Sequence, residues 1–362
     1  MAGVYLSYPF CAQKCTYCNF ASGVLPRHVE AQYPDALIRE LASTNWEWAP
    51  DTVYLGGGTP SALDPDVLDR ILAAVPGSPW REATIEAAPG SFTPEAAGRW
   101  VRAGINRVSL GVQSFIRNEL ARTGRKHTTE TVVADVANLR AAGIGNFNLD
   151  LISGLPGQTA GSWAESLDWI ERISPPHVSV YMLEVDEDSR LGRELLLGGV
   201  RYGAGDVPGN EAIADFYETA VERLARIGIP RYEISNFARP GFESIHNLKY
   251  WRREPYVGFG SDAHSFNGAE RWRNAESAEE YVALSPNARS AAEPSDAAEE
   301  KFFVGLRLSE GIDFSPGELA RHAPTINRFL TGGLMEQTGS RLRLTPAGVM
   351  LSNEIFEHFL NT

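Results

Sequence analysis

Three cysteines that lie close together are the residues whose type and spacing most directly indicate chemistry. Cys11, Cys15 and Cys18 are the only cysteines among the 362 residues, and they form a C-x3-C-x2-C pattern. An odd, clustered set of cysteines is not a disulfide framework. Thiolates are the ligands of iron–sulfur clusters, and three of them leave one iron of a cubane cluster free for an exogenous chelator. The alternative is a zinc site of three cysteines and one histidine, with His28 as the histidine.

A glycine-rich loop and several polar residues follow predicted strands farther along the chain. Residues 56–60 read Gly-Gly-Gly-Thr-Pro directly after a strand-like run, and glycine lets the backbone approach a ligand closely. Glu86, Gln113 and Asp150 lie at or near the ends of other strand-like runs. In a parallel barrel the C-terminal strand ends carry the chemistry. The alternative is that these residues only suit the geometry of their turns.

Alternating strand-like and helix-like runs would have to position these residues. The sequence predicts helices at residues 34–44, 64–74, 94–103 and 129–142. It predicts strands at residues 4–7, 52–55, 83–86, 107–113, 147–152, 178–183 and 231–234. Strands that alternate with helices indicate βα units and a parallel sheet. Six or seven such units favour a full or partial barrel, although periodicity alone does not exclude a doubly wound sheet.

The last part of the chain is predicted to form a small separate module. Residues 198–210 and 285–298 have the composition of connectors. The tail from residue 300 shows two helical patterns, a short hairpin strand at residues 341–344 and a closing helix, which together resemble a winged helix. We therefore expect an α/β domain over residues 1–265, and a linker with an α+β winged-helix-like module over residues 266–362.

Composition narrows the class of protein. The formal net charge is -13, which argues against a nucleic-acid partner that is held by its phosphates. No apolar run approaches the roughly 18 residues of a membrane span. The first residues show no basic segment before an apolar stretch, so a cytoplasmic protein is the expectation.

The cysteine spacing resembles that of the radical S-adenosylmethionine (SAM) superfamily, and the Gly-Gly-Gly-Thr-Pro loop is similar to its segment that contacts the SAM amino group. The resemblance implies a partial (β/α)6 barrel, a 4Fe-4S cluster on Cys11, Cys15 and Cys18, and SAM bound at the open iron.

Longer motifs resemble the oxygen-independent coproporphyrinogen III oxidase family over essentially the whole chain. Examples are Gly104-x-x-Arg107-x-Ser-x-Gly-x-Gln113-x-Phe115 and Tyr232-Glu-Ile-Ser-Asn-Phe237. By motif position, the resemblance implies that SAM is bound by Tyr5, Tyr17, Gly57, Gly58, Thr59, Glu86, Gln113, Arg125 and Asp150. The last three residues named, Gln113, Arg125 and Asp150, fall where the oxidase binds a second SAM. The alternative for Arg125 and Asp150 is a salt bridge at the barrel rim.

Two departures from the oxidase resemble the HemW haem-chaperone branch instead. Phe20 stands where the oxidase carries a fourth cysteine, and only ten residues precede Cys11. Residues 246–251 read His-Asn-Leu-Lys-Tyr-Trp and match the H-N-x-x-Y-W signature of the branch. The resemblance implies that haem is bound and handed to haem-requiring proteins such as respiratory enzymes. Oxidative decarboxylation of coproporphyrinogen III and radical SAM chemistry on another substrate are the alternatives.

The haem site is assigned to the same signature. His246 is the predicted ligand of the haem iron, with Asn247, Tyr250 and Trp251 as its supporting wall. The alternative is a structural linker whose aromatic side chains pack under the C-terminal module. His264, in Gly-Phe-Gly-Ser-Asp-Ala-His-Ser, is the next candidate. Transient association with a membrane and formation of a homodimer stay open.

Overall fold

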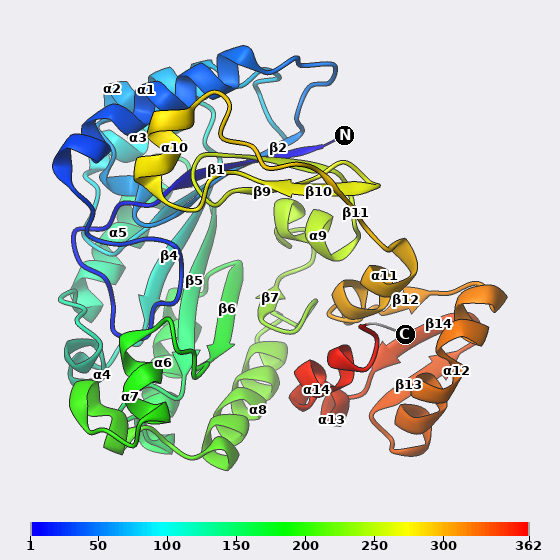
Figure 1. Cartoon of the computed structure of the whole chain (residues 1–362). Coiled ribbons are helices and arrows are strands. Elements are labelled where there is room, and N and C mark those ends of the chain that lie inside the picture. The colour runs from blue at the N-terminus through cyan, green and yellow to red at the C-terminus, as the bar shows by residue number, and fades with distance from the viewer. Residues whose placement is uncertain (1, 361–362) are drawn as a thin grey trace.

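The computed structural model of the protein describes residues 2–360, and its main feature is a large open sheet (Figure 1). The eleven strands of this sheet have the order β11-β10-β9-β8-β1-β2-β3-β4-β5-β6-β7. The six strands from β1 to β6 run parallel to one another. Their bounds are Gly3–Tyr8, Thr52–Gly57, Glu82–Ala87, Arg107–Gln113, Asn146–Ser153 and His177–Met182. The predicted parallel strands are thus present, and they form a partial barrel.

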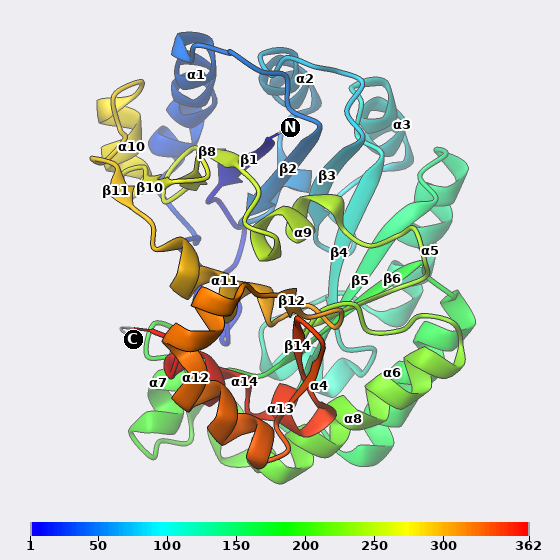
Figure 2. The ribbon, with the colours of Figure 1, turned by 90° about the vertical axis from the view of Figure 1, so that its right-hand side faces the viewer.

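Helices connect the parallel strands and cover the outer face of the sheet (Figure 2). Several begin at a capping side chain: Asp64, Thr93, Thr128 and Thr159 each accept a hydrogen bond from a backbone N–H of the first turn. The helices are α1 (Arg27–Ser43), α2 (Pro65–Ala73), α3 (Pro94–Arg102), α4 (Arg117–Arg122), α5 (Thr129–Ala141), α6 (Ala160–Ile173), α7 (Arg190–Leu196) and α8 (Asn210–Arg226), with short 3-10 turns η1 (Pro60–Ala62) and η2 (Arg201–Asp206). The segment predicted as a connector at residues 198–210 therefore contains η2.

The inward-facing side chains of the barrel are mostly polar. Asn148 of β5 donates from its amide to the hydroxyls of Ser109 on β4 and Ser179 on β6, over 2.9 Å in each case. On the outer side of β4, by contrast, Val108 and Leu110 are fully buried beneath the helices. Parallel barrels usually fill their interior with branched apolar side chains. This barrel instead has a hydrogen-bonded lining that can face a polar ligand.

The seventh predicted strand is wrong in its position. Residues 231–234 form no strand but two isolated β-bridges, from Arg231 to Phe237 and from Glu233 to Leu308. The chain then reverses over residues 232–236, where Tyr232 N–H donates to the Asn236 carbonyl over 3.0 Å. The strand that follows, β7 (Asn236–Ala238), pairs antiparallel with β6. The parallel part of the barrel therefore ends at β6.

The sheet continues on its other side beyond β1. Strand β8 (Tyr256–Phe259) pairs parallel with β1, and β9 (His264–Phe266), β10 (Glu270–Arg273) and β11 (Glu293–Pro294) follow antiparallel. Helix α9 (Ile245–Trp251) precedes β8, and α10 (Ala278–Leu284) packs against α1. The expected boundary between residues 265 and 266 falls inside β9, so we propose that the barrel domain extends to β11.

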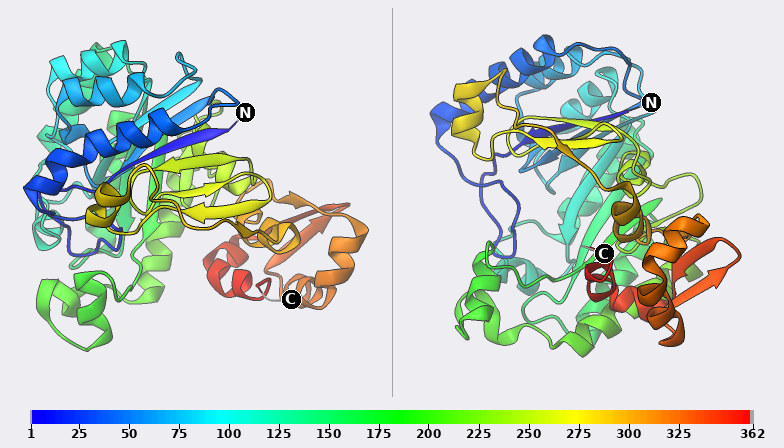
Figure 3. Two further views of the ribbon diagram at one scale, coloured as in Figure 1. Left: turned by 45° about the horizontal axis from the view of Figure 1, so that its top comes forward. Right: turned by 45° about the vertical axis from the view of Figure 1, so that its right-hand side comes forward.

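A small α+β module ends the described chain (Figure 3). Phe302 of its first helix stacks on Phe359 with ring centroids 5.0 Å apart, and both side chains are fully buried. Its elements are α11 (Ala297–Gly305), β12 (Ile312–Asp313), α12 (Pro316–Thr331), β13 (Met335–Thr338), β14 (Arg341–Leu344), α13 (Pro346–Met350) and α14 (Ser352–Glu357), and its sheet has the order β12-β14-β13. Helices and a hairpin agree with the winged-helix-like prediction. Within residues 2–360, no helix combines the length and the apolar character that a membrane crossing needs.

Candidate functional site

The glycine loop is attached directly to the segment that leads into the cysteines. Gly58 N–H donates to the carbonyl oxygen of Tyr8 over 2.7 Å, and Thr59 N–H donates to that of Phe10 over 2.9 Å. Gly57 has φ +112°, a conformation that favours glycine. A Cβ atom on Gly58 would lie 2.4 Å from the Phe10 carbonyl oxygen. Glycine is therefore required for this close approach of loop and strand.

The three cysteines lie in one loop that follows β1. Their side chains are partly exposed and free of disulfides. Burial raises the pKa of the Cys11 thiol, although hydrogen bonds with Ser22 and Thr59 oppose the rise. The far side of the loop is fixed by the segment around α7, because Leu191 N–H donates to the Thr16 carbonyl over 2.8 Å and the Asn19 amide donates to the Asp186 carboxylate over 2.8 Å. Three thiols on one anchored loop fit the three ligands that a cluster needs.

The zinc alternative would add His28 to the three cysteines. Among residues 2–360, no three His, Cys, Asp or Glu side chains are arranged as ligands of a single metal ion. His28, the histidine of that alternative, lies exposed in the first turn of α1.

Two carboxylates face the interior of the barrel near the glycine loop. Glu86 accepts hydrogen bonds from the Tyr54 hydroxyl over 2.9 Å and from Gly57 N–H over 3.1 Å. Asp150 accepts from the Asn148 amide over 2.6 Å and from the Ser109 hydroxyl over 3.2 Å. Burial raises the pKa of Glu86 to about 7 and also raises that of Asp150. Their hydrogen-bond donors within residues 2–360 are all neutral, so a cationic ligand would stabilise both carboxylates.

Gln113 and Arg125 extend the site toward the cysteine loop. The Arg125 guanidinium donates to the Tyr17 hydroxyl over 3.3 Å, and Tyr17 lies between Cys15 and Cys18. Gln113 has φ 69°. A Cβ on Gly111 would lie 3.0 Å from the Gln113 amide nitrogen and 3.4 Å from the guanidinium, so both side chains border the same glycine.

Two buried atoms of this pair have no hydrogen-bond partner among the described residues. They are Oε1 of Gln113 and Nε of Arg125. Buried polar atoms are normally paired, so these two are positioned for a ligand that supplies a donor and an acceptor. SAM carries an ammonium group and a carboxylate, and the residues present therefore fit it.

The sequence-predicted SAM residues thus come together at one end of the barrel. Tyr5 joins them, because its ring stacks on Tyr54 at 6.1 Å between centroids and Tyr54 donates to Glu86. The salt bridge between Arg125 and Asp150, which was the alternative to their role in SAM binding, does not form in the described residues, since Asp150 is bonded to neutral side chains.

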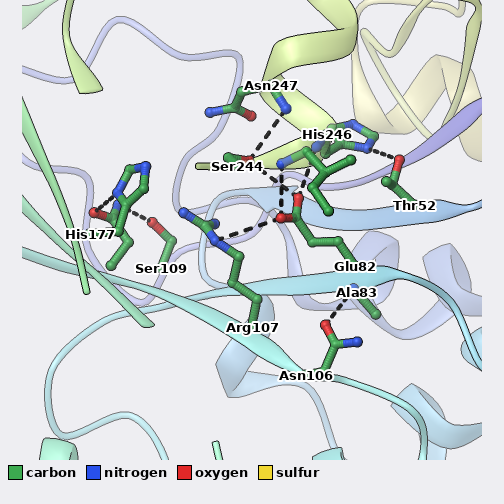
Figure 4. Close-up of polar contacts among 12 residues, drawn as sticks. Thr52, Glu82, Ala83, Asn106, Arg107, Ser109, His177, Ser244, His246 and Asn247 are labelled. Atoms are coloured by element: carbon green, nitrogen blue, oxygen red, sulfur yellow. Dashed lines mark hydrogen bonds and ion pairs between the residues drawn. The ribbon is translucent and has the colours of Figure 1, made fainter. Parts of the chain in front are cut away.

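His246 lies beside Thr52 (Figure 4). Thr52 begins β2, whereas the glycine loop follows the end of that strand, so His246 is at the other end of the barrel from the SAM residues. This position disagrees with its prediction as the haem ligand. Its Nδ1 bonds to the hydroxyl of Thr52, the first residue of β2, over 2.9 Å. Its Nε2 bonds to the Tyr250 hydroxyl over 2.7 Å. The side chain is fully buried, and burial lowers its pKa to about 3. Both ring nitrogens are engaged, so neither is available to an iron in this arrangement.

The other residues of the signature lie at the same end of the barrel, near the start of β2, which we call the floor of the barrel. Asn247 N–H donates to the Ser244 hydroxyl over 3.3 Å, which caps α9. Tyr250 packs edge-on against Tyr256 at 4.6 Å, and Trp251 lies under the Arg307 guanidinium at 4.5 Å. These contacts match the structural alternative, in which the aromatic side chains pack between barrel and C-terminal module.

The sequence did not predict the polar network of Glu82 and Arg107 that fixes the start of α9 at the floor of the barrel (Figure 4). The Glu82 carboxylate accepts from Ile245 N–H over 2.9 Å and His246 N–H over 2.8 Å at the start of α9. Arg107 lies 4.0 Å from Glu82, and both side chains are 2% exposed. The signal was present in the sequence, because Glu82, Thr84 and Glu86 alternate with apolar residues in a parallel strand. Strands of parallel sheets usually lack such alternation.

His264 differs from His246 in its exposure. It lies in β9 with 60% of its side chain exposed, and its Nε2 is 4.0 Å from the Asp262 carboxylate.

Comparisons with known proteins identify relatives of both the barrel and the C-terminal module. Residues 5–170 match the model of the radical SAM superfamily, and residues 292–351 match that of the HemN C-terminal domain. A protein named heme chaperone HemW from Lactococcus lactis is 32% identical over 371 residues, which cover 98% of this chain and 96% of that protein. The protein of the same name from Bacillus subtilis is 32% identical over 386 residues, with 99% of each chain covered. The chain belongs to the HemW haem-chaperone family.

The fold of this HemW-family chain also occurs in a solved enzyme. The structure of coproporphyrinogen III oxidase from Escherichia coli, described as a radical SAM enzyme, gives a TM-score of 0.86 at 22% identity. It covers 99% of this chain and 90% of the oxidase. The partial barrel with its C-terminal module is thereby confirmed as the fold class.

Proposed function

We propose that this protein is a haem-binding chaperone on a radical SAM scaffold, which carries a 4Fe-4S cluster and SAM and delivers haem to haem proteins. The observation that carries the proposal is the similarity, over nearly the full length of both chains, to two proteins named heme chaperone HemW. The geometry at the mouth of the barrel supports the cofactor part of the proposal.

Cys11, Cys15 and Cys18 would hold the cluster. When bound, a cluster with an open iron supplies a binding point for SAM and an electron source for reductive chemistry. The chain's own contribution is to fix the loop. Backbone hydrogen bonds join the cysteine segment to the glycine loop, from Thr59 N–H to the Phe10 carbonyl, and to the α7 segment, from Leu191 N–H to the Thr16 carbonyl.

SAM would be held between groups of opposite charge. The Arg125 guanidinium can bind a carboxylate as a bidentate pair, and its Nε has no partner among the described residues. Glu86 and Asp150 would face the cationic and hydroxyl groups of the ligand. Tyr5, Tyr17, Gln113 and the loop of Gly57, Gly58 and Thr59 complete the proposed site. Because the unpaired atoms lie beside the cysteine loop, SAM and cluster would be adjacent.

Haem and haem-accepting proteins such as respiratory enzymes are the proposed partners. The competing function is oxidation of coproporphyrinogen III, which the likeness of fold to the oxidase favours. Phe20 argues against it by resemblance, since the oxidase carries a cysteine there. The Phe20 side chain is 68% exposed on the cysteine loop.

One anaerobic experiment separates these functions. The protein is reconstituted with iron and sulfide and divided in two portions. One is titrated with haem, and the other receives coproporphyrinogen III, SAM and a reductant. We expect a saturable Soret band in the first portion and no decarboxylated porphyrinogen in the second. Turnover of the porphyrinogen would overturn the chaperone proposal, and so would failure to bind haem.

A further inference from the structure

We propose that His264 is the axial ligand of the haem iron and that Arg273 binds a haem propionate. This inference rests on the proposed function, because it names the residues that would hold the haem. It replaces His246, whose ring nitrogens are both occupied in the buried floor of the barrel.

Accessible imidazoles are few among residues 2–360. Of the seven histidines, His177, His246 and His322 are buried. His127 bonds through Nε2 to the Val112 carbonyl over 3.0 Å, and His358 lies 3.2 Å from the Arg328 guanidinium. Only His28 and His264 are exposed without a hydrogen bond to another described residue. A haem ligand needs a ring nitrogen with a free lone pair and open space around it for the porphyrin. His127 keeps such a lone pair on Nδ1 but is partly buried, so His28 and His264 are the candidates.

The two candidate histidines lie on different faces of the molecule. His28 belongs to α1, which lies in the outer layer of helices (Figure 2). His264 and Phe266 are two residues apart in β9, so their side chains point to the same face of the sheet. Phe266 packs against Tyr256 at 6.3 Å, and Tyr256 packs against Tyr250 in the floor of the barrel. His264 therefore belongs to the concave face of the sheet.

His264 has an arginine and an aspartate as neighbours. Arg273 of β10 is directly opposite it in the antiparallel pair, and opposite residues project to the same face with Cβ atoms about 4.5–5.5 Å apart. The Arg273 side chain is exposed and donates no hydrogen bond to another described residue. An arginine can bind a propionate carboxylate in bidentate fashion. Asp262, whose carboxylate is 4.0 Å from the imidazole, can accept the remaining ring N–H and strengthen the ligand.

The strand that crosses His264 pairs with a strand of the proposed SAM site. Gly258 of β8 lies in register with Tyr5 of β1. A Cβ on Gly258 would lie 2.4 Å from the His264 carbonyl oxygen, so glycine permits the close crossing that positions His264. Haem on His264 would thus lie beside the proposed SAM site.

The experiment is a haem titration of the whole reconstituted protein, followed by the Soret band. His264→Ala is compared with His28→Ala, the same change at the other exposed imidazole. We expect the first variant to lose the wild-type Soret maximum and to bind haem at least about tenfold more weakly. The second should match wild type. Free imidazole should restore the maximum in His264→Gly, because it can occupy the vacated coordination position.

Haem dimethyl ester tests the role of Arg273, because its propionates carry no charge. Arg273→Gln should weaken the binding of haem and leave that of the ester unchanged. Wild-type spectrum and affinity in His264→Ala would overturn the inference while the proposed function stands. Failure of the wild-type protein to bind haem would overturn both.

Discussion

Gly57 donates its backbone N–H to the Glu86 carboxylate over 3.1 Å, which ties the glycine loop at the end of β2 to the end of β3. Glu86 is thereby held at the mouth of the barrel with a pKa raised by burial to about 7. Its charge consequently changes near neutral pH, where the binding of a cationic ligand can respond to it.

SAM affinity should rise with pH because of Glu86. Below a pH of about 7 the carboxyl is mostly protonated, and above it the carboxylate attracts the cationic sulfonium group. Isothermal titration between about pH 5.5 and about pH 7.5 should show stronger binding at the upper end. Glu86→Gln should remove this dependence, and Glu218→Gln, at an exposed carboxyl of α8, should keep it. A wild-type affinity that does not change over this range would contradict the assignment of Glu86.

Each cysteine should be indispensable for the cluster. Replacing Cys15 by Ser removes one of three thiolates, and an iron without a stable protein ligand is readily lost. We expect loss of the visible cluster absorption and of most iron and acid-labile sulfide after anaerobic reconstitution. Ala12→Ser, an exposed change in the same loop, should retain the cluster. Full iron content in Cys15→Ser would show that another residue is the ligand.

Gly58→Ala should disturb the cysteine loop. The added Cβ would lie 2.4 Å from the Phe10 carbonyl oxygen, so loop and strand must separate. We expect a loss of about 2–4 kcal/mol in the free energy of unfolding by urea, together with weaker SAM binding. At Gly209 a Cβ would meet nothing within 4 Å, so Gly209→Ala is the matched control. Equal stability of both variants would refute the close contact.

The buried His246 should make its contribution to stability depend on pH. Its pKa is lowered to about 3 in the folded protein from 6.5. The unfolded chain therefore binds the extra proton first, and the contribution of the neutral ring is complete above 6.5 and is lost as the pH falls toward 3. His246→Gln should be less stable than wild type at neutral pH, and the difference between them should shrink in acid. Urea unfolding at several pH values measures this difference, and a constant difference would contradict a neutral buried ring.

The strands that end at the mouth of the barrel could be predicted from the sequence, because local patterns define where they begin and end. Strand β4 begins and ends where its apolar alternation does, at Arg107 and Gln113, and the carboxyl ends of parallel strands meet at one edge. The position of His246 could not be predicted, because a local signature does not say which end of the barrel a helix covers. Strand β10, which lies next to the edge strand β11, reads Glu-Arg-Trp-Arg and lacks the apolar pattern of a buried strand. Arg273 was therefore missed, although it lies opposite His264.

Strand β1 lies between β2 and β8, so the first strand of the chain completes its pairing only with residues 256–259. The cysteine loop leaves directly from the end of β1. During synthesis, the cysteines therefore emerge from the ribosome long before the partner that fixes one edge of their supporting strand. Pairings between such distant segments form late in folding. Metal insertion should accordingly follow translation of the barrel, and a nascent chain that ends before β8 should present these thiols to oxidants and free metal ions.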